Sequence, residues 1–315
     1  MLYLLILSTF APTNAWVRIA DFNRTFVGDP DVLIIGNQKA GTTSLSELFT
    51  NRLKVYVTSG GRKEPHFFDR RFTDDGFNRY IDGFKSMKAR KGNDLLTLDA
   101  TPAFFRTPLA LERFVSLYSP ASLRRKKFIL SLREPVVRDY SWFMLNYRLC
   151  KRFVSQKCLL GSNKSSQDTF HEFVNRMYRN DSYLSDGFAL LHLKRLLALI
   201  PRDQVFIVNF ESLIGEQQAD TLNRLFAFLG IPPIQIPHLP HSNSKKSNCG
   251  NKNCEDPRLE HILCSDIRFL NETYSRANHG LIEFINNHPD RPISESIFPP
   301  FKERFPLVCI DDGRS

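Results

Sequence analysis

The 315-residue chain contains no run of about 18 apolar residues, which a membrane-spanning helix needs, and a polytopic membrane protein is therefore excluded. The sequence also lacks internal repeats and low-complexity segments. Its 42% hydrophobic and 24% charged residues are ordinary for a globular protein and exclude collagen, coiled coil and wholesale disorder. A chain of this length buries roughly 75% of its unfolded surface, so a full hydrophobic core can form.

Cysteine is scarce, with six residues and no C-x-x-C pair or spaced histidine pair, which argues against a zinc site. Six cysteines fit an oxidising compartment instead. Cys150 and Cys158 lie eight residues apart in a polar stretch, and we predict a disulfide between them. The other four are harder to pair. Cys249 with Cys254 is the first choice, and Cys264 and Cys309 are left over.

Residues 1–15 predict a targeting segment. They are apolar from Leu2 to Phe10, which is too short to span a bilayer. Thr13 and Ala15 then stand like the −3 and −1 residues of a cleavage site. The usual positive charge at the start is missing. The segment is therefore read either as a signal peptide or as part of a truncated signal anchor that would hold the protein at a membrane.

The rest of the chain is predicted to be one folded domain, residues 30–310, preceded by a short stem at residues 16–29. Glycosylation signals agree with the targeting segment and the cysteines, and all three indicate the secretory pathway. The four N-x-Ser/Thr acceptors are Asn23, Asn163, Asn180 and Asn271.

Positive charge is concentrated rather than spread. The formal net charge is +10, while residues 52–92 alone carry +6 and residues 121–152 carry +7. Such stretches indicate a polyanionic partner, which could be a nucleic acid, a phospholipid surface, an anionic polysaccharide or a nucleotide. A solvated basic face without a partner is the alternative for either stretch alone.

Strand-like runs alternate with helical patterns, which is typical of βαβ units. The sequence therefore predicts an α/β fold in which a central, mainly parallel sheet lies between two helical layers, as in P-loop proteins. A Pro- and Asn-rich loop is expected over residues 232–260. Strands are predicted at 31–35, 95–98, 127–132 and 205–208, and helices at 42–53, 135–148 and 219–229.

The segment Gly36–Ser44, between the first predicted strand and helix, has the composition of a phosphate-binding loop. Its glycines allow a close approach, and the amides at the helix start favour an anion beside Lys39. Lys39 precedes Gly41, whereas the lysine of a Walker A loop follows the last glycine and stands before a magnesium-binding Ser or Thr. This order argues against a P-loop kinase. A Gly- and Lys-rich turn without function is the alternative.

Two further segments carry chemistry. Arg133 follows a predicted strand, and Ser141 lies about two turns into the next helix. Because ligands bind at the carboxyl ends of strands in an open α/β sheet, Arg133 is expected in the crevice of Lys39. The segment Lys63–Asp69 combines two carboxylates with an imidazole. Glu64 could act there as a general base, although a turn with a surface ion pair is the simpler interpretation.

Together and in this order, the three segments resemble the sulfotransferases, most closely the Golgi enzymes that sulfate glycosaminoglycans. The resemblance covers roughly residues 30–285. It implies 3′-phosphoadenosine 5′-phosphosulfate as the donor, no metal, a location in the Golgi lumen, and an anionic polysaccharide rather than a nucleic acid as the partner. Within the branch that includes the heparan sulfate enzymes, Lys63–Asp69 and Asn271–Tyr274 favour the chondroitin-type 6-O-sulfating group.

The resemblance also implies a role for each matching residue. Glu64 would take the proton of the acceptor hydroxyl, with His66 and Asp69 orienting the base or the sugar. Arg133 and Ser141 would bind the 3′-phosphate. The 5′-phosphosulfate would lie on Lys39, which neutralises the leaving oxygen, and on the loop residues Ala40, Gly41, Thr42, Thr43 and Ser44.

One departure from the pattern concerns a second lysine. Heparan-type members carry it after the next strand, where this chain has Ala100. Either Arg106 substitutes, or the mechanism depends more on Lys39. A catalytically weak or inactive polysaccharide-binding protein is the alternative function. Lys245 and Lys246 resemble a lysine-bearing loop that covers the nucleotide, with a plain basic loop as the alternative. The sequence leaves the acceptor sugar and the oligomeric state open.

Overall fold

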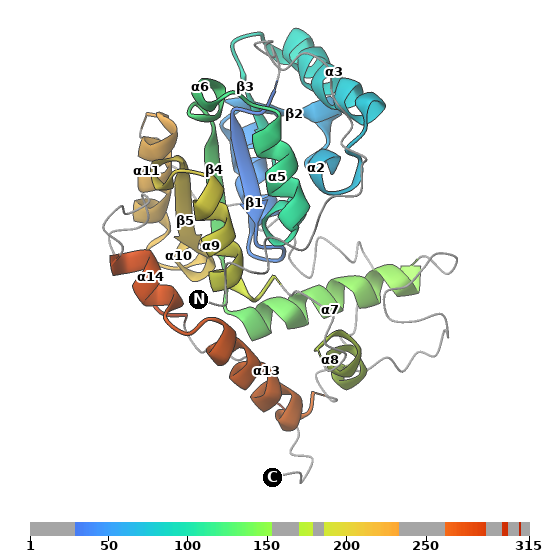
Figure 1. Cartoon of the computed structure of the whole chain (residues 1–315), viewed down its shortest axis with the longest axis vertical. Helices are drawn as coiled ribbons and strands as arrows, with labels where there is room; N and C mark the ends of the chain where they lie inside the picture. The colour runs from blue at the N-terminus through green and yellow to red at the C-terminus, as the bar shows by residue number, and fades with distance from the viewer. Residues whose placement is uncertain are drawn as a thin grey trace, which may run out of the picture.

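The structure is a computed structural model of the chain, and it describes residues 29–152, 170–178, 186–232, 262–287, 298–301 and 309. Its centre is a parallel sheet with the strand order β2-β3-β1-β4-β5 (Figure 1). The chain leaves β1 toward one edge and later returns to pair β4 on the other side of β1. The strands are β1 Val32–Gly36, β2 Tyr56–Thr58, β3 Leu96–Asp99, β4 Lys127–Leu132 and β5 Val205–Asn209.

This order places a topological switch point between β1 and β4. Loops that follow the two strands diverge there, and ligands of open α/β sheets bind in the crevice between them. The segment after β1 begins at Asn37, and the segment after β4 begins at Arg133. Two of the three chemistry-bearing segments therefore start at the same point of the sheet.

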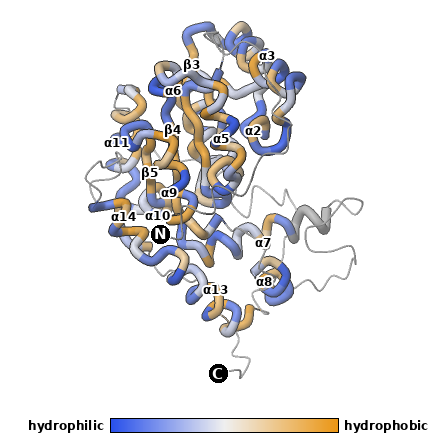
Figure 2. The backbone as a smooth tube through the Cα atoms, viewed as in Figure 1, coloured by the Kyte–Doolittle hydropathy of each residue, from blue (hydrophilic) through white to orange (hydrophobic). Residues whose placement is uncertain are grey.

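Both faces of the sheet are buried, because its strands are almost continuously apolar. In β1, Leu33 and Ile35 pack in one hydrophobic cluster while Val32 and Ile34 pack in another, as the alternation of side chains along a strand requires. Figure 2 shows these central strands mainly in the colour of apolar residues. The predicted three-layer α/β/α fold is confirmed.

Helices cover the two faces, and several begin or end where the sequence dictates. The N-cap residue of α3, Asp74–Lys91, is Thr73, whose Oγ1 accepts a hydrogen bond from Gly76 N at 3.0 Å. The C-cap residue of α11, Gln218–Leu229, is Gly230 in the left-handed conformation, φ 72°. The helices are α1 Thr42–Glu47, α2 Phe67–Arg70, α3 Asp74–Lys91, α4 Ala103–Arg106, α5 Pro108–Ser116, α6 Pro120–Leu123, α7 Pro135–Arg152, α8 Phe170–Tyr178, α9 Ala189–Leu199, α10 Phe210–Ile214, α11 Gln218–Leu229, α13 Cys264–Ala277 and α14 Leu281–Asn287, with a π-helical turn at Leu48–Arg52 and 3₁₀ turns at Ser59–Gly61 and Arg202–Gln204.

The four strands predicted from the sequence are confirmed within one residue at each end. Strand β2 was not predicted, because three residues are too few to show a period. The helix expected at 42–53 is regular only to Glu47 and continues as the π-helical turn Leu48–Arg52. Most of the expected loop at 232–260 lies outside the described residues.

A third hydrophobic cluster joins α7, α8 and α13, which Figure 1 shows grouped at the end of the molecule away from α3. A disulfide between Cys264 and Cys309 ties α13 to the C-terminal segment, with 5.0 Å between the Cα atoms. It settles the pairing of the two cysteines that the sequence left over. Cys158, Cys249, Cys254 and the side chain of Cys150 lie outside the described residues, so both predicted pairs stay predictions.

Two other predictions bear on the secretory pathway. Of the four glycosylation acceptors, Asn271 is exposed on α13, while Asn23, Asn163 and Asn180 lie outside the described residues, as does the targeting segment. Among the helices that the structure describes, none has the length and apolarity to cross a membrane.

Candidate active site

The loop after β1 is fixed to the neighbouring strand β4. Asn37 donates its backbone N–H to the carbonyl oxygen of Ser131 at 2.6 Å. The Ser131 hydroxyl in turn donates to the carbonyl oxygen of Ala40 at 2.7 Å, and Ala40 is fully buried. These two bonds hold both ends of the loop turn against β4.

The turn itself depends on left-handed backbone. Lys39 has φ 72° and Gly41 has φ 80°, and only glycine adopts this conformation without steric cost. A Cβ atom at Gly41 would also lie 3.0 Å from the Phe210 ring. Gly41 is the N-cap residue of α1 and, having no side chain, cannot itself cap the first amides of that helix. Gly41 therefore permits the shape of the loop, and Lys39 supplies its charge while itself adopting left-handed backbone.

Arg133 lies against the same loop. Its Nη1 donates to the carbonyl oxygen of Lys39 at 3.0 Å, and its guanidinium lies 4.5 Å from the centre of the Phe210 ring. Burial lowers the pKa of Arg133, while the carboxylates of Glu211 and Glu134 act in the opposite direction. Its Nε is buried and has no hydrogen-bond partner in the described structure. A buried guanidinium N–H of this kind suits an anion.

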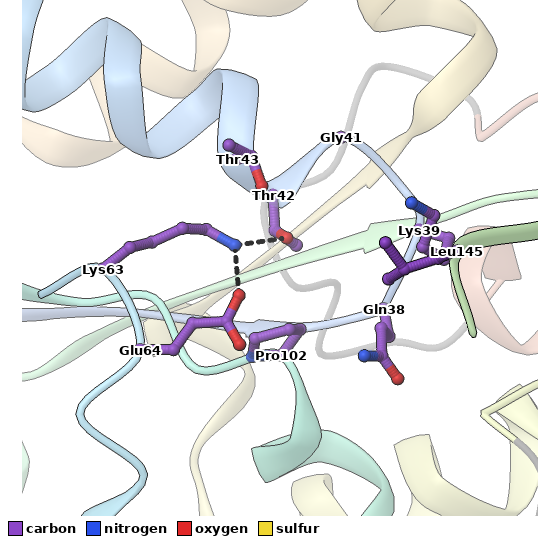
Figure 3. A pocket seen from close by; sticks show the side chains of 9 residues that line it. All are labelled: Gln38, Lys39, Gly41, Thr42, Thr43, Lys63, Glu64, Pro102 and Leu145. Carbon is purple, nitrogen blue, oxygen red and sulfur yellow. Dashed lines mark hydrogen bonds and ion pairs between the residues drawn. The ribbon is translucent and has the colours of Figure 1, made fainter. Parts of the chain in front are cut away.

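The third segment joins the loop through Lys63. The Ala100 N–H donates to the carbonyl oxygen of Lys63 at 3.1 Å, which places the segment beside the end of β3. The Lys63 ammonium donates to Glu64 Oε1 at 2.6 Å and to Thr42 Oγ1 at 3.3 Å (Figure 3). One side chain thus links the segment that carries Glu64 to the first residue of α1.

Glu64 also pairs with His66, which in turn pairs with Asp69. His66 Nε2 lies 3.4 Å from Glu64 Oε2, and His66 Nδ1 lies 2.9 Å from Asp69 Oδ2. Burial raises the pKa of Glu64, but the hydrogen bond of His66 and the charge of Lys63 outweigh it and lower this pKa to about 2. Hydrogen bonds to Asp69 and Glu64 raise the pKa of His66 to about 9. At neutral pH, Glu64 is therefore an anion and His66 a cation.

A pocket of about 190 Å³ opens between these segments. This is smaller than the roughly 300–1,000 Å³ of pockets for drug-sized ligands, so it suits one compact group rather than a whole nucleotide. In Figure 3, Lys63 and Glu64 approach it from one side, and Lys39 and Leu145 lie on the other. The residues that line it are Gln38, Lys39, Gly41, Thr42, Thr43, Lys63, Glu64, Pro102 and Leu145.

The structure thus brings Lys39 and Glu64 to one pocket. Arg133 contacts the pocket residue Lys39. His66 contacts the pocket residue Glu64, and Asp69 contacts His66. Ser44 and Ser141 are partly buried, in α1 and α7. Neither is among the residues that line the pocket. Lys245 and Lys246 lie outside the described residues.

The sequence predicts no role for four lining residues, Gln38, Lys63, Pro102 and Leu145, although Gln38 and Lys63 lie in segments predicted to carry the chemistry. Only Lys63 carried a signal, since a lysine next to the expected base is a candidate by charge alone. Arg106, the suggested substitute for a lysine at position 100, lies elsewhere. Its Nε is 3.9 Å from Asp186, and its guanidinium is 6.0 Å from the Trp142 ring centre. In the described residues, no group of three or more His, Cys, Asp and Glu is placed to hold a metal.

Residues 29–262 match the family model described as the sulfotransferase domain. The chain belongs to this sulfotransferase family. The sulfotransferase from Alicyclobacillus acidocaldarius has the same fold: its crystal structure superposes with a TM-score of 0.55 at 20% identity, covering 83% of this chain and 98% of that one.

Curated relatives of this sulfotransferase include human heparan sulfate glucosamine 3-O-sulfotransferase 5, 26% identical over 65% of this chain and 54% of the relative. Human heparan sulfate glucosamine 3-O-sulfotransferase 3B1 is 29% identical over 65% of this chain and 47% of the relative. The bifunctional heparan sulfate N-deacetylase/N-sulfotransferase 1 of Caenorhabditis elegans is 26% identical over 82% of this chain and 30% of the relative. The chain spans about half the length of the first two and less of the third.

The charge on His66 predicts a pH-dependent stability of this sulfotransferase. In the folded protein His66 keeps its proton up to about pH 9, whereas in the unfolded chain it loses the proton near pH 6.5. Its stabilising effect is therefore complete below pH 6.5 and is lost as the pH rises to 9. We expect wild-type protein to lose about 3 kcal/mol of unfolding free energy from this group over that interval, and His66→Gln to lack this loss.

Urea unfolding at pH 6 and at pH 9.5 measures the difference. The matched control is His279→Gln, at an exposed histidine after α13, which should keep the wild-type pH dependence. If His66→Gln has the same pH dependence as wild type, the ion pairs of His66 with Asp69 and Glu64 do not form in solution.

Proposed function

We propose that this chain transfers a sulfuryl group from 3′-phosphoadenosine 5′-phosphosulfate to a hydroxyl of a glycosaminoglycan, in the Golgi lumen. The observation that carries the proposal is the meeting of Lys39 and Glu64 at one pocket, at the switch point of the sheet. A cation and a carboxylate on opposite sides of a compact pocket can hold an anionic group and take a proton from its acceptor.

The residues present fit this donor. When bound, it supplies an activated sulfuryl group attached to its 5′-phosphate. Lys39 and the loop amides from Ala40 to Ser44 would hold this end. Arg133, whose buried Nε has no hydrogen-bond partner among the described residues, would bind the 3′-phosphate together with Ser141. Lys245 and Lys246 would cover the nucleotide.

Glu64 would accept the proton of the acceptor hydroxyl. Because its pKa is lowered to about 2, it is deprotonated across the physiological range, as a proton acceptor must be. His66 and Asp69 would orient it, since His66 bridges the two carboxylates. Positioning and positive charge would supply most of the rate enhancement, because the transferred group stays anionic throughout.

A polyanionic acceptor agrees with the surface around Glu64. Arg62, Arg70 and Arg71 are exposed in the same segment. The names of the curated relatives favour heparan sulfate as the acceptor, whereas the segments Lys63–Asp69 and Asn271–Tyr274 favour a chondroitin-type acceptor. Both belong to the glycosaminoglycans, and the experiment has to separate them.

The test incubates the purified chain with donor labelled in its sulfuryl group and with heparan sulfate, chondroitin and a neutral polysaccharide. We expect label in one of the two glycosaminoglycans and none in the neutral polymer. Disaccharide analysis then gives the position sulfated. Donor binding without transfer to any acceptor would contradict the proposal and leave an inactive polysaccharide-binding protein.

Donor binding gives a separate prediction for Lys39. We expect Lys39→Ala to weaken binding of adenosine 3′,5′-bisphosphate by roughly 10–100-fold, the loss of a charge-assisted contact of about 1.5–3 kcal/mol. Titration calorimetry measures it. Lys91→Ala, at an exposed lysine in the last turn of α3, is the matched control and should bind normally. Near-normal affinity of Lys39→Ala would remove the loop from the donor site.

A further inference from the structure

The Lys63 ammonium is a charged group of the pocket that the proposed function does not use. It lines the pocket together with Lys39, but it comes from a different segment of the chain. Its side chain is only 23% exposed, so its charge acts where water screens it weakly. Two lysines therefore face one compact space, although the described roles need only one.

Position 100 explains why this second lysine matters. Ala100 is fully buried and packs in the hydrophobic cluster of Leu45 and Leu48, so this position supplies no charge. Its backbone N–H nevertheless donates to the Lys63 carbonyl oxygen at 3.1 Å. The two residues are thus neighbours on adjacent segments. Of the two, Lys63 is the one that lines the pocket, so this neighbouring segment brings a cation to it although position 100 supplies none.

We propose that Lys63 is a catalytic residue that leaves Glu64 and donates to the sulfuryl group during transfer, replacing the lysine that is missing at position 100. The inference rests on the proposed function. It follows from the position of the ammonium, 3.3 Å from Thr42 Oγ1 and 2.6 Å from Glu64 Oε1. An ammonium has three N–H donors, and its contact to Thr42 keeps it at the start of α1 when it releases Glu64.

These groups account for the proton, the bond that forms and the bond that breaks in the proposed transfer. Glu64 accepts the proton of the acceptor hydroxyl as the acceptor oxygen bonds to sulfur. The bond between sulfur and the 5′-phosphate oxygen breaks, and its electron pair stays on that oxygen beside Lys39. Lys63 neutralises charge on the sulfuryl oxygens that take no part in either bond. Lys39 would thus stabilise the charge on the leaving oxygen, and Lys63 the charge on the sulfuryl oxygens.

The movement of Lys63 from Glu64 to the sulfuryl group would also make Glu64 a stronger base. Lys63 and His66 together hold the pKa of Glu64 at about 2, which makes the free carboxylate a weak proton acceptor. When Lys63 turns to the sulfuryl group, Glu64 keeps only His66 as a partner and its pKa rises. Glu64 would therefore become a stronger base when the sulfuryl group is in place.

The first experiment titrates Glu64 directly, by ¹³C NMR of labelled glutamate carboxylates, with Glu64→Gln used to assign the signal. We expect Lys63→Met, which keeps length without charge, to raise the pKa of Glu64 by one unit or more. In wild-type protein, 3′-phosphoadenosine 5′-phosphosulfate should raise it likewise, whereas adenosine 3′,5′-bisphosphate, which lacks the sulfuryl group, should not. In Lys63→Met, the donor should cause no further rise.

The second experiment measures single-turnover transfer. We expect Lys63→Met to be slower by roughly 10²–10³-fold, the usual effect of removing one group that stabilises transition-state charge. Its affinity for adenosine 3′,5′-bisphosphate should stay within about threefold of wild type, and Lys63→Arg should recover part of the rate. Lys91→Met is the matched control and should react normally.

A wild-type rate in Lys63→Met would overturn the inference, and so would a Glu64 pKa that is the same with donor and with bisphosphate. A weakened bisphosphate affinity would also overturn it, because Lys63 would then hold the nucleotide and not the transferred group. If wild-type protein transfers no sulfuryl group at all, the proposed function fails. The NMR titration then decides on its own whether Lys63 exchanges partners.

Discussion

Glu64→Gln should lower the single-turnover rate by roughly 10²–10⁴-fold, the contribution of a positioned general base. The amide keeps the shape of the side chain and can still hydrogen-bond, but it cannot accept a proton. Affinity for adenosine 3′,5′-bisphosphate should change little, because Glu64 reaches the pocket from the side opposite Lys39. Affinity for the polyanionic acceptor should be unchanged or tighter, since one negative charge is removed.

The control is Glu216→Gln, at an exposed glutamate before α11, which should react like wild type. A normal rate in Glu64→Gln with intact nucleotide binding would mean that another group takes the proton. His66 is the nearest such group, and the pH profile separates the two. Because the pKa of His66 is raised to about 9, a histidine base would give a rate that climbs up to that pH, whereas a Glu64 base gives no such rise.

Most of the fold could be predicted because its strands are buried on both faces. A run such as Val32–Gly36 is apolar from end to end and is followed by a loop that contains Lys39 and Gly41 and then by a helical pattern, which leaves few alternatives. Strand β2 could not be predicted, because Tyr56–Thr58 forms a strand only by pairing with Leu96–Leu98. The irregular end of the helix after Glu47 likewise has no local signal.

The site was predictable in its parts but not in its assembly. Lys39 and Arg133 stand at the ends of adjacent strands, and this much follows from the α/β pattern. The approach of Glu64 depends on a backbone bond between Lys63 and Ala100, two residues 37 positions apart, and no local pattern reports such a contact. The use of Lys63 to bridge Glu64 and Thr42 follows from that bond.

The segment after β4 contains one arginine whose role the sequence indicates and another whose role depends on tertiary contacts. Arg133 was assigned to binding from its place after the strand, but the neighbouring Arg138 carries the larger structural role. Arg138 is fully buried and forms ion pairs with Asp139 and with Asp186, the latter at 3.1 Å. Asp139 also accepts hydrogen bonds from two tyrosine hydroxyls, those of Tyr178 in α8 and Tyr274 in α13. This network joins α7, α8, α13 and the segment before α9.

Arg138→Met should therefore destabilise the protein by about 3–5 kcal/mol, the cost of removing one partner from a buried ion pair. Most of that cost comes from the carboxylates of Asp139 and Asp186, which would stay buried without the Arg138 guanidinium, although Asp186 would keep Arg106 at 3.9 Å. Urea unfolding at neutral pH measures it, with Arg195→Met at an exposed arginine of α9 as the matched control. The double variant Arg138→Met/Asp186→Asn should be more stable than Arg138→Met, because one of the two buried carboxylates that lost the Arg138 guanidinium would then carry no charge. A loss below about 1 kcal/mol in Arg138→Met would mean that water reaches the network, and that the apolar contacts of α7, α8 and α13 alone hold these helices together.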